Sequence, residues 1–183
     1  GLILGSVIVA LTFSIMNGME EAIFTKLKNI SFTAKIENIS NRSYLEIKDI
    51  LIKNKINYYT GIEDQVAIFN DTSFRNVTIH GIENFDKNYK NIIGNELEIS
   101  DIPLNTSSIY IGEDLAIKLN LNPGDIIDII SFKQFNILLG LPKSSSLIVK
   151  GVFKANILDY EYRHVFIDNM FLSDFLPSNK SVY

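Results

Sequence analysis

The N-terminal stretch is an apolar run with no charged side chain, and it constrains the fold more than any other feature. It covers residues 1–16, GLILGSVIVALTFSIM. As an α-helix it would be about 24 Å long, against about 30 Å for the hydrocarbon core of a bilayer. A signal peptide would end at a small-residue cleavage site, whereas Glu20 and Glu21 follow here, and a run apolar on all faces disfavours a core helix. We therefore expect the outer end of a transmembrane helix that begins before Gly1.

The residues after this run keep the spacing of a helix but become amphipathic. Apolar side chains recur at Met19, Ala22, Ile23, Leu27 and Ile30, with charges between them. This pattern predicts one long helix that leaves the membrane and enters the folded domain.

Composition excludes several classes of protein. The chain is 46% hydrophobic over 183 residues, which excludes general disorder and allows a sizeable core. A net charge of −4 with no basic face excludes typical nucleic-acid binding. Cysteine is absent, which removes disulfides, zinc–thiolate sites and thiol nucleophiles.

The rest of the chain mixes helical and strand patterns, so we expect an α+β domain. Strands are expected at residues 32–36, 57–59, 65–70, 75–82, 108–111, 126–131, 147–153 and 164–167, the sixth of them buried. Helices are expected at 42–53, packed on a small sheet, at 113–119, and at 170–176, where Pro177 ends the helix. Turns are expected at 70–72 and 122–125, and residues 84–104 look irregular around Ile92 and Ile93. A boundary near 95–107 would separate an α/β part, about 29–95, from a mainly β part, about 96–183, with the chain truncated after Tyr183.

Residues able to carry chemistry are few. His80 and His164 lie far apart, and each is best interpreted as a satisfied or surface histidine. The carboxylate pairs Asp125/Asp128 and Asp159/Glu161, the latter in a loop, fit a solvated surface. Neither a glycine-rich phosphate loop nor a G-x-S-x-G elbow is present. We expect no catalytic, cofactor-binding or metal-binding residue, and hence no enzyme.

The connector between the strands expected at 126–131 and 147–153 is unusually apolar. It reads FKQFNILLGLPKSSS over residues 132–146, although connectors are usually polar. Two interpretations remain open: an exposed interaction patch, or a hairpin whose apolar side packs on its own sheet.

Several short motifs occur in an order that resembles one family. Residues 14–20, SIMNGME, are similar to a V-M-N-G-F-E segment, and His80-Gly81-Ile82 to a G-I-D element. Residues 111–116, IGEDLA, with Leu119 and Gly124-Asp125, match I-L-G-E-x-L-A…L-G-V-x-x-G-D, and residues 151–153 match a V-x-G-x-F strand. Over nearly the whole chain this resembles the lipoprotein-releasing ABC permeases of the LolC/LolE type, whose periplasmic domain is MacB-like.

The resemblance implies an organisation and a function. Residues 1–28 would be the end of the first of four transmembrane helices and its periplasmic extension, and residues 29–183 the periplasmic domain, with a porter-like α/β subdomain and a mainly β subdomain. The protein would lie in a bacterial inner (cytoplasmic) membrane and release lipoprotein cargo to a periplasmic lipoprotein carrier. Its other partners would be a cytoplasmic ATPase subunit and a second permease subunit, the same or homologous. Alternatives are an efflux or division permease of the MacB/FtsX type and a sensor or binding domain on a single-pass anchor.

The resemblance also implies two groups of site residues. The family's carrier-binding hook has a Phe followed seven positions later by Pro, as Phe135 and Pro142 do here. Ile137 replaces a common Pro, and Lys143 stands where the family has Arg. The implied partner-binding hairpin comprises Phe132, Phe135, Ile137, Leu138, Leu139, Gly140, Leu141 and Pro142. The implied membrane-exit coupling residues are Met16, Asn17, Gly18 and Glu20.

Overall fold

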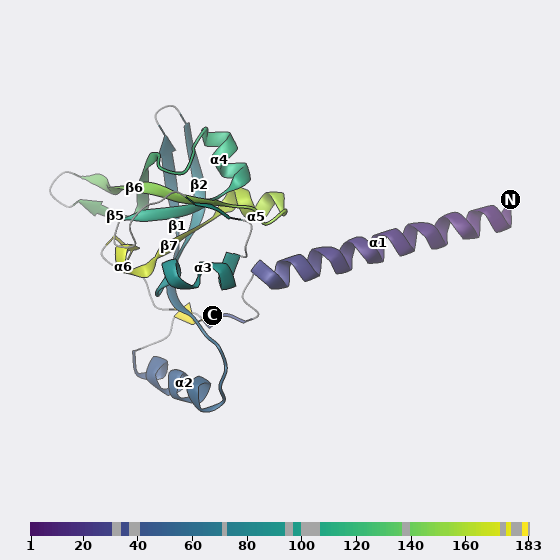
Figure 1. Cartoon of the computed structure of the whole chain (residues 1–183), viewed down its shortest axis with the longest axis horizontal. Helices are drawn as coiled ribbons and strands as arrows, with labels where there is room; N and C mark the ends of the chain where they lie inside the picture. Colours follow the sequence, from purple (N-terminus) through teal and green to yellow (C-terminus); the bar gives the residue numbers. More distant parts are fainter. Residues whose placement is uncertain are drawn as a thin grey trace.

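The computed structural model describes residues 1–30, 34–36, 41–70, 73–93, 97–99, 107–136, 140–172, 175–176 and 181–182. Its first element is the single helix α1, Leu2–Ile30, which projects from the body of the domain (Figure 1). The stretch Ile3–Ala22 is long and apolar enough to cross a membrane, and none of it is buried. One continuous helix from the apolar run into the amphipathic stretch is therefore confirmed. A core helix is excluded, because side chains such as Phe13 are 57% exposed.

Six strands close into a barrel. They are β1 (Thr60–Asn70), β2 (Ser73–Ile82), β4 (Ser108–Gly112), β5 (Ile126–Asn136), β6 (Leu141–Phe153) and β7 (His164–Asp168). Their order is β2-β7-β4-β6-β5-β1, and β1 also pairs directly with β2, so the described strands form a closed ring. Within the ring β2–β7 and β4–β6 are parallel pairs, and the others are antiparallel. The short strands β3 (Leu97–Ile99) and β8 (Ser181–Val182) pair with β6 and β1. Closure removes the open edges at which sheets aggregate.

Two apolar clusters form the core. The larger is made mostly by strand residues and includes Val66, Ile79, Ile109, Val149 and Val165, all fully buried. Successive side chains of a strand face opposite sides of the sheet, so alternate residues of each strand point into the barrel and form this cluster. The second cluster packs helix α3 (Phe85–Ile93) on the sheet through Phe85, Tyr110, Phe153 and Phe166. The Phe85 and Phe166 rings stack with their centroids 5.3 Å apart.

The remaining helices are short. Helix α4 (Glu113–Leu119) follows β4 at once and ends at Asn120, which adopts the left-handed conformation common at helix C-termini. Helix α5 (Leu158–Arg163) lies so close to Gly112 that a Cβ there would run into the backbone of Glu161. Glycine at position 112 is therefore what allows α5 to approach β4. Helix α6 (Asn169–Leu172) follows β7 directly.

Several expectations for single elements are confirmed. The helix expected at 42–53 is α2 (Asn41–Lys53), and the one expected at 113–119 is α4. The hairpin expected around residue 71 joins β1 to β2, with Asn70 paired to Ser73. At the turn of residues 122–125, Gly124 has a positive φ of 103°, and Asp125 Oδ2 accepts the backbone N–H of Asn122 at 2.7 Å. These helices and turns are determined by residues close together in the sequence, so local sequence patterns predict them well.

Other expectations for the N-terminal half are wrong. Residues 57–59 do not form a strand, and β1 instead begins at Thr60. The region expected to be irregular contains α3 and β3. The many polar residues of this region made the apolar spacing of α3 hard to recognise in the sequence. Helix α2 does not pack on the sheet: Leu45 and Ile50 are 61% and 58% exposed, and α2 lies apart from the barrel in Figure 1. Of the strand expected at 32–36, residues 34–35 are not in a strand, Ile36 makes a single bridge, and 32–33 lie outside the described residues.

In the C-terminal half, the strand expected to be buried is buried on one side only. Ile127 is buried, while Ile126 is 66% exposed, because successive side chains of β5 face opposite sides. Asp159 and Glu161 belong to α5 rather than to a loop. Asp159 is exposed as expected, but Glu161 is buried, and its Oε1 accepts the backbone N–H of Ala155 at 2.6 Å. Helix α6 ends at Leu172, and residues 173–174 lie outside the described part of the chain.

The α+β class is confirmed, since an apolar helix is followed by a domain of mixed helices and strands. Strands from both sides of residue 95 pair with one another, β1 with β5 and β2 with β7. The described strands of the two expected parts therefore share one sheet.

Candidate functional site

The apolar connector forms the outer part of the β5–β6 hairpin. We call residues 132–136 and 140–143 the arm. It extends beyond the barrel on the side away from α1 (Figure 1). Phe132, Phe135 and Leu141 are 51%, 58% and 60% exposed. Of the two interpretations of the connector, these side chains fit the exposed patch and not a hairpin folded onto its own sheet.

The outer end of the arm is set by strand pairing. Phe135 stands opposite Pro142, and Asn136 opposite Leu141. Gly140 has a φ of +64°, a conformation that favours glycine, although an added Cβ would meet no neighbouring atom. The expected partner-binding residues Ile137, Leu138 and Leu139 lie outside the described residues.

The base of the arm is an irregularity in the β5–β6 ladder. Regular pairing stops after Ile130 and resumes at Phe135. Between them Ser131 is fully buried, and its Oγ accepts the backbone N–H groups of Lys133 and Gln134, each at 3.2 Å. The Lys133 ammonium donates to the buried Asp64 carboxylate on β1 at 2.5 Å. A bulge of this kind bends a strand and re-aims the residues beyond it, so this base sets the direction of the arm.

The charged residues of the arm, Lys133 and Lys143, are both basic. Lys143 Nζ lies 5.8 Å from the centre of the Phe175 ring, within the range of a cation–π contact. The arm therefore offers an apolar surface with Lys143 at its margin, whereas the charge of Lys133 is paired with Asp64.

The expected membrane-exit residues lie at the other side of the molecule. Met16, Asn17, Gly18 and Glu20 are all exposed on α1, within the apolar span or at its end. The C-terminal end of α1 lies beside α3 (Figure 1). The structure therefore does not bring the two expected groups of site residues together.

A buried ion pair links α3 to the strand that carries the arm. Lys150 of β6 donates to Asp86 Oδ2 at 2.7 Å, and the side chains are only 5% and 7% exposed. The Tyr110 hydroxyl of β4 donates to the other carboxylate oxygen at 2.9 Å. Burial first, and then the Asp86 charge, raise the pKa of Tyr110. Sequence reasoning missed this group, because its members are up to 64 positions apart.

The two histidines form a second group that sequence reasoning missed. The parallel pairing of β2 with β7 places His80 Nε2 2.8 Å from His164 Nδ1. His80 Nδ1 lies 3.4 Å from Glu63 Oε2, and Lys35 donates to the same oxygen at 2.5 Å. The two imidazoles are therefore partners of one another, which was not foreseen. The expectation of a satisfied histidine is met only in part, because His80 Nδ1 is buried without a hydrogen-bond partner.

The charge states of this histidine group follow from its contacts. The nearby His80 ring, and then Lys35, lower the pKa of Glu63 from 4.5 to about 2, although burial opposes this. Burial, followed by the charge of His80, lowers the pKa of His164 from 6.5 to about 4. Neutral His164 can therefore accept a hydrogen bond at Nδ1 from the Nε2–H of His80, while Glu63 stays ionised. No set of three or more His, Cys, Asp or Glu residues able to hold a metal occurs in the part of the chain that the structure describes.

Comparison with known proteins gives structural likeness only. No protein-family model matches the chain, and no curated protein matches it. The periplasmic region of MacB from Actinobacillus actinomycetemcomitans is similar at 12% identity and a TM-score of 0.49, over 85% of this chain and 76% of that one. The extracellular domain of the noncanonic ABC-type transporter YknZ from Gram-positive bacteria is similar at 15% identity and a TM-score of 0.46, over 81% of each chain.

Proposed function

We propose that the chain is the extracytoplasmic domain of an ABC transporter permease that releases lipoproteins from a bacterial inner membrane to a periplasmic carrier. The observation that carries the proposal is the exposed arm on the side away from α1, in which Phe135 and Pro142 face one another. The ordered motifs along the sequence support the same family. In this proposal the chain is not an enzyme: ATP is hydrolysed by a cytoplasmic subunit, and a second permease subunit completes the complex.

The arm has the properties of a docking element. Burying an exposed side chain such as Phe135 or Leu141 on a partner would contribute about 1.5–3 kcal/mol. A few large side chains usually dominate such an interface. Lys143 would favour a carrier with an acidic residue beside an apolar groove.

A series of contacts through α3 and β6 connects α1 to the arm and suits a transmitting role. The end of α1 lies beside α3, α3 is held to β6 by the buried pair of Asp86 and Lys150, and β6 runs into the arm at Leu141. Movement of the membrane helix caused by ATP hydrolysis would reach the arm through packed and hydrogen-bonded parts.

The test is binding of the soluble lipoprotein carrier from the same bacterium to the full chain in detergent micelles, measured by calorimetry. We expect wild type to bind and Phe135→Ala with Leu141→Ala to lose binding. Phe74→Ala is the matched control, because Phe74 is 55% exposed on the β1–β2 hairpin; it should bind as wild type does. No binding by wild type, or full binding by the double variant, would refute carrier docking and favour an efflux or division permease.

A further inference from the structure

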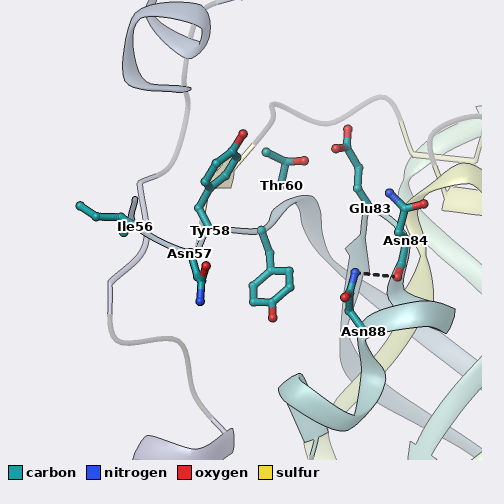
Figure 2. Close-up of a pocket in the computed structure, with 8 residues that line it drawn as sticks. Ile56, Asn57, Tyr58, Thr60, Glu83, Asn84 and Asn88 are labelled. Atoms are coloured by element: carbon teal, nitrogen blue, oxygen red, sulfur yellow. Dashed lines mark hydrogen bonds between the residues drawn. The ribbon is translucent and has the colours of Figure 1, made fainter. Parts of the chain in front are cut away.

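A polar hollow lies between the segment that leads into β1 and the start of α3. Its volume is about 470 Å³, within the usual range for small-molecule sites. Figure 2 shows Tyr58 and Thr60 on one wall and Glu83, Asn84 and Asn88 on the other. None of the residues that line it belongs to the arm.

The wall nearer α3 is held by short-range contacts. The Glu83 backbone N–H donates to the Thr60 carbonyl at 2.8 Å. This hydrogen bond joins the two walls where β1 begins and β2 ends. Asn84 has a φ of 54°, a left-handed conformation that asparagine tolerates better than most residues. The Asn88 amide donates to the Asn84 carbonyl at 3.2 Å. Phe85, fully buried beside Asn84, anchors the start of α3, so these polar groups are positioned before any ligand arrives.

The chemistry of the lining selects among ligand classes. The lining residues that the structure describes are asparagines, a threonine, two tyrosines, Glu83 and Ile56. None of these carries a positive charge, so they do not match phosphates or other anions. Among these described residues the aliphatic one is Ile56, which is 52% exposed, so they offer an acyl chain little apolar contact. Amides and hydroxyls both donate and accept hydrogen bonds, and a tyrosine ring offers an apolar face beside a polar tip.

We infer that this hollow binds a saccharide chain without negative charge. Sugar hydroxyls match the amides of Asn84 and Asn88 and the carboxylate of Glu83, which accepts hydrogen bonds only. The C–H face of a sugar ring fits against the half-buried Tyr58. The open, polar form of the hollow suits a ligand that keeps part of its surface in water. The inference does not depend on the function of the arm, because the two surfaces share no residue.

The experiment is saturation-transfer NMR on the full chain, with cellotetraose and the tetramer of N-acetylglucosamine as probes. The detergent is dodecylphosphocholine, because maltoside detergents would themselves present sugar to the site. We expect saturation transfer from the protein to at least one tetrasaccharide at millimolar concentration. Absence of transfer to both probes overturns the inference.

Variants locate the binding. Tyr58→Ala and Asn88→Ala should each weaken binding about tenfold, the effect of losing one ring or amide contact. Tyr162→Ala, a half-buried tyrosine of α5 outside the lining, is the matched control and should bind as wild type does. Circular dichroism checks that each variant is folded. If Tyr58→Ala and Tyr162→Ala bind equally well, the sugar lies elsewhere and the inference is wrong.

Discussion

Replacing Lys150 by methionine should test how strongly the buried ion pair holds α3 to the barrel. Lys150 Nζ lies 2.7 Å from Asp86 Oδ2, and both side chains are at least 93% buried. Methionine keeps the apolar stem but leaves the Asp86 charge in the interior without its cation. Breaking a buried pair in this way costs about 3–5 kcal/mol. The Tyr110 hydroxyl still donates to Asp86, so the carboxylate keeps one partner, and we expect a loss at the lower end of this range, about 3 kcal/mol.

The assay is urea unfolding of the full chain in detergent micelles, followed by circular dichroism, in a double-mutant cycle. The double variant Asp86→Asn with Lys150→Met removes both charges of the pair. Its free energy of unfolding should fall less than that of Lys150→Met alone, because no uncompensated carboxylate remains. The matched control is Lys154→Met. Lys154 pairs with Glu113 at 2.6 Å, but the two side chains are 47% and 39% exposed, so its loss should cost about 0–1 kcal/mol. Equal losses for the variants at 150 and 154 would refute the reasoning.

Three further predictions concern other parts of the structure. Gly112→Ala should lower the unfolding midpoint, with a loss of about 2–4 kcal/mol, because its Cβ would meet the Glu161 backbone; a loss below about 0.5 kcal/mol would show that α5 moves aside freely. Acid should destabilise the domain in two stages, since His164 and Glu63 have folded-state pKa values of about 4 and 2, below their ordinary 6.5 and 4.5. The unfolded chain then binds more protons, so stability is complete above about pH 6.5 and falls towards pH 4 and then towards pH 2; a urea midpoint that stays constant from pH 7 to 4 contradicts this for His164. Phe135→Ala should change the unfolding free energy by less than about 0.5 kcal/mol, because the side chain is already exposed; a larger loss would mean that the arm packs on the domain.

Elements controlled by neighbouring residues could be predicted. The uncharged run and the helical spacing after it predicted α1 as one helix. The apolar run before Gly112 and the helical spacing after it predicted β4 and, directly behind it, α4. Helix α3 was missed, although Phe85, Tyr89 and Ile92 have the spacing of a helical face. Its polar residues lowered the average hydrophobicity of the region.

The candidate site could be predicted in part. The sequence showed that residues 132–146 are too apolar for an ordinary connector, but it left open which way their side chains face. Exposure of Phe132 and Phe135 came from the structure. So did the base of the arm, since Lys133 meets Asp64 from 69 positions away.

By itself, the sequence determined the features that depend on short stretches of chain: the apolar helix, the turns, the surplus of apolar residues in the connector and most strand positions. Only the tertiary structure decided that six strands close into a ring, that His80 meets His164 across 84 positions, and that Asp86 meets Lys150. The physical reason is that side-chain periodicity tells which face of a strand is buried but not which strand lies beside it. Pairing between distant strands is settled by the packing of the whole core, and the buried polar contacts follow from that pairing.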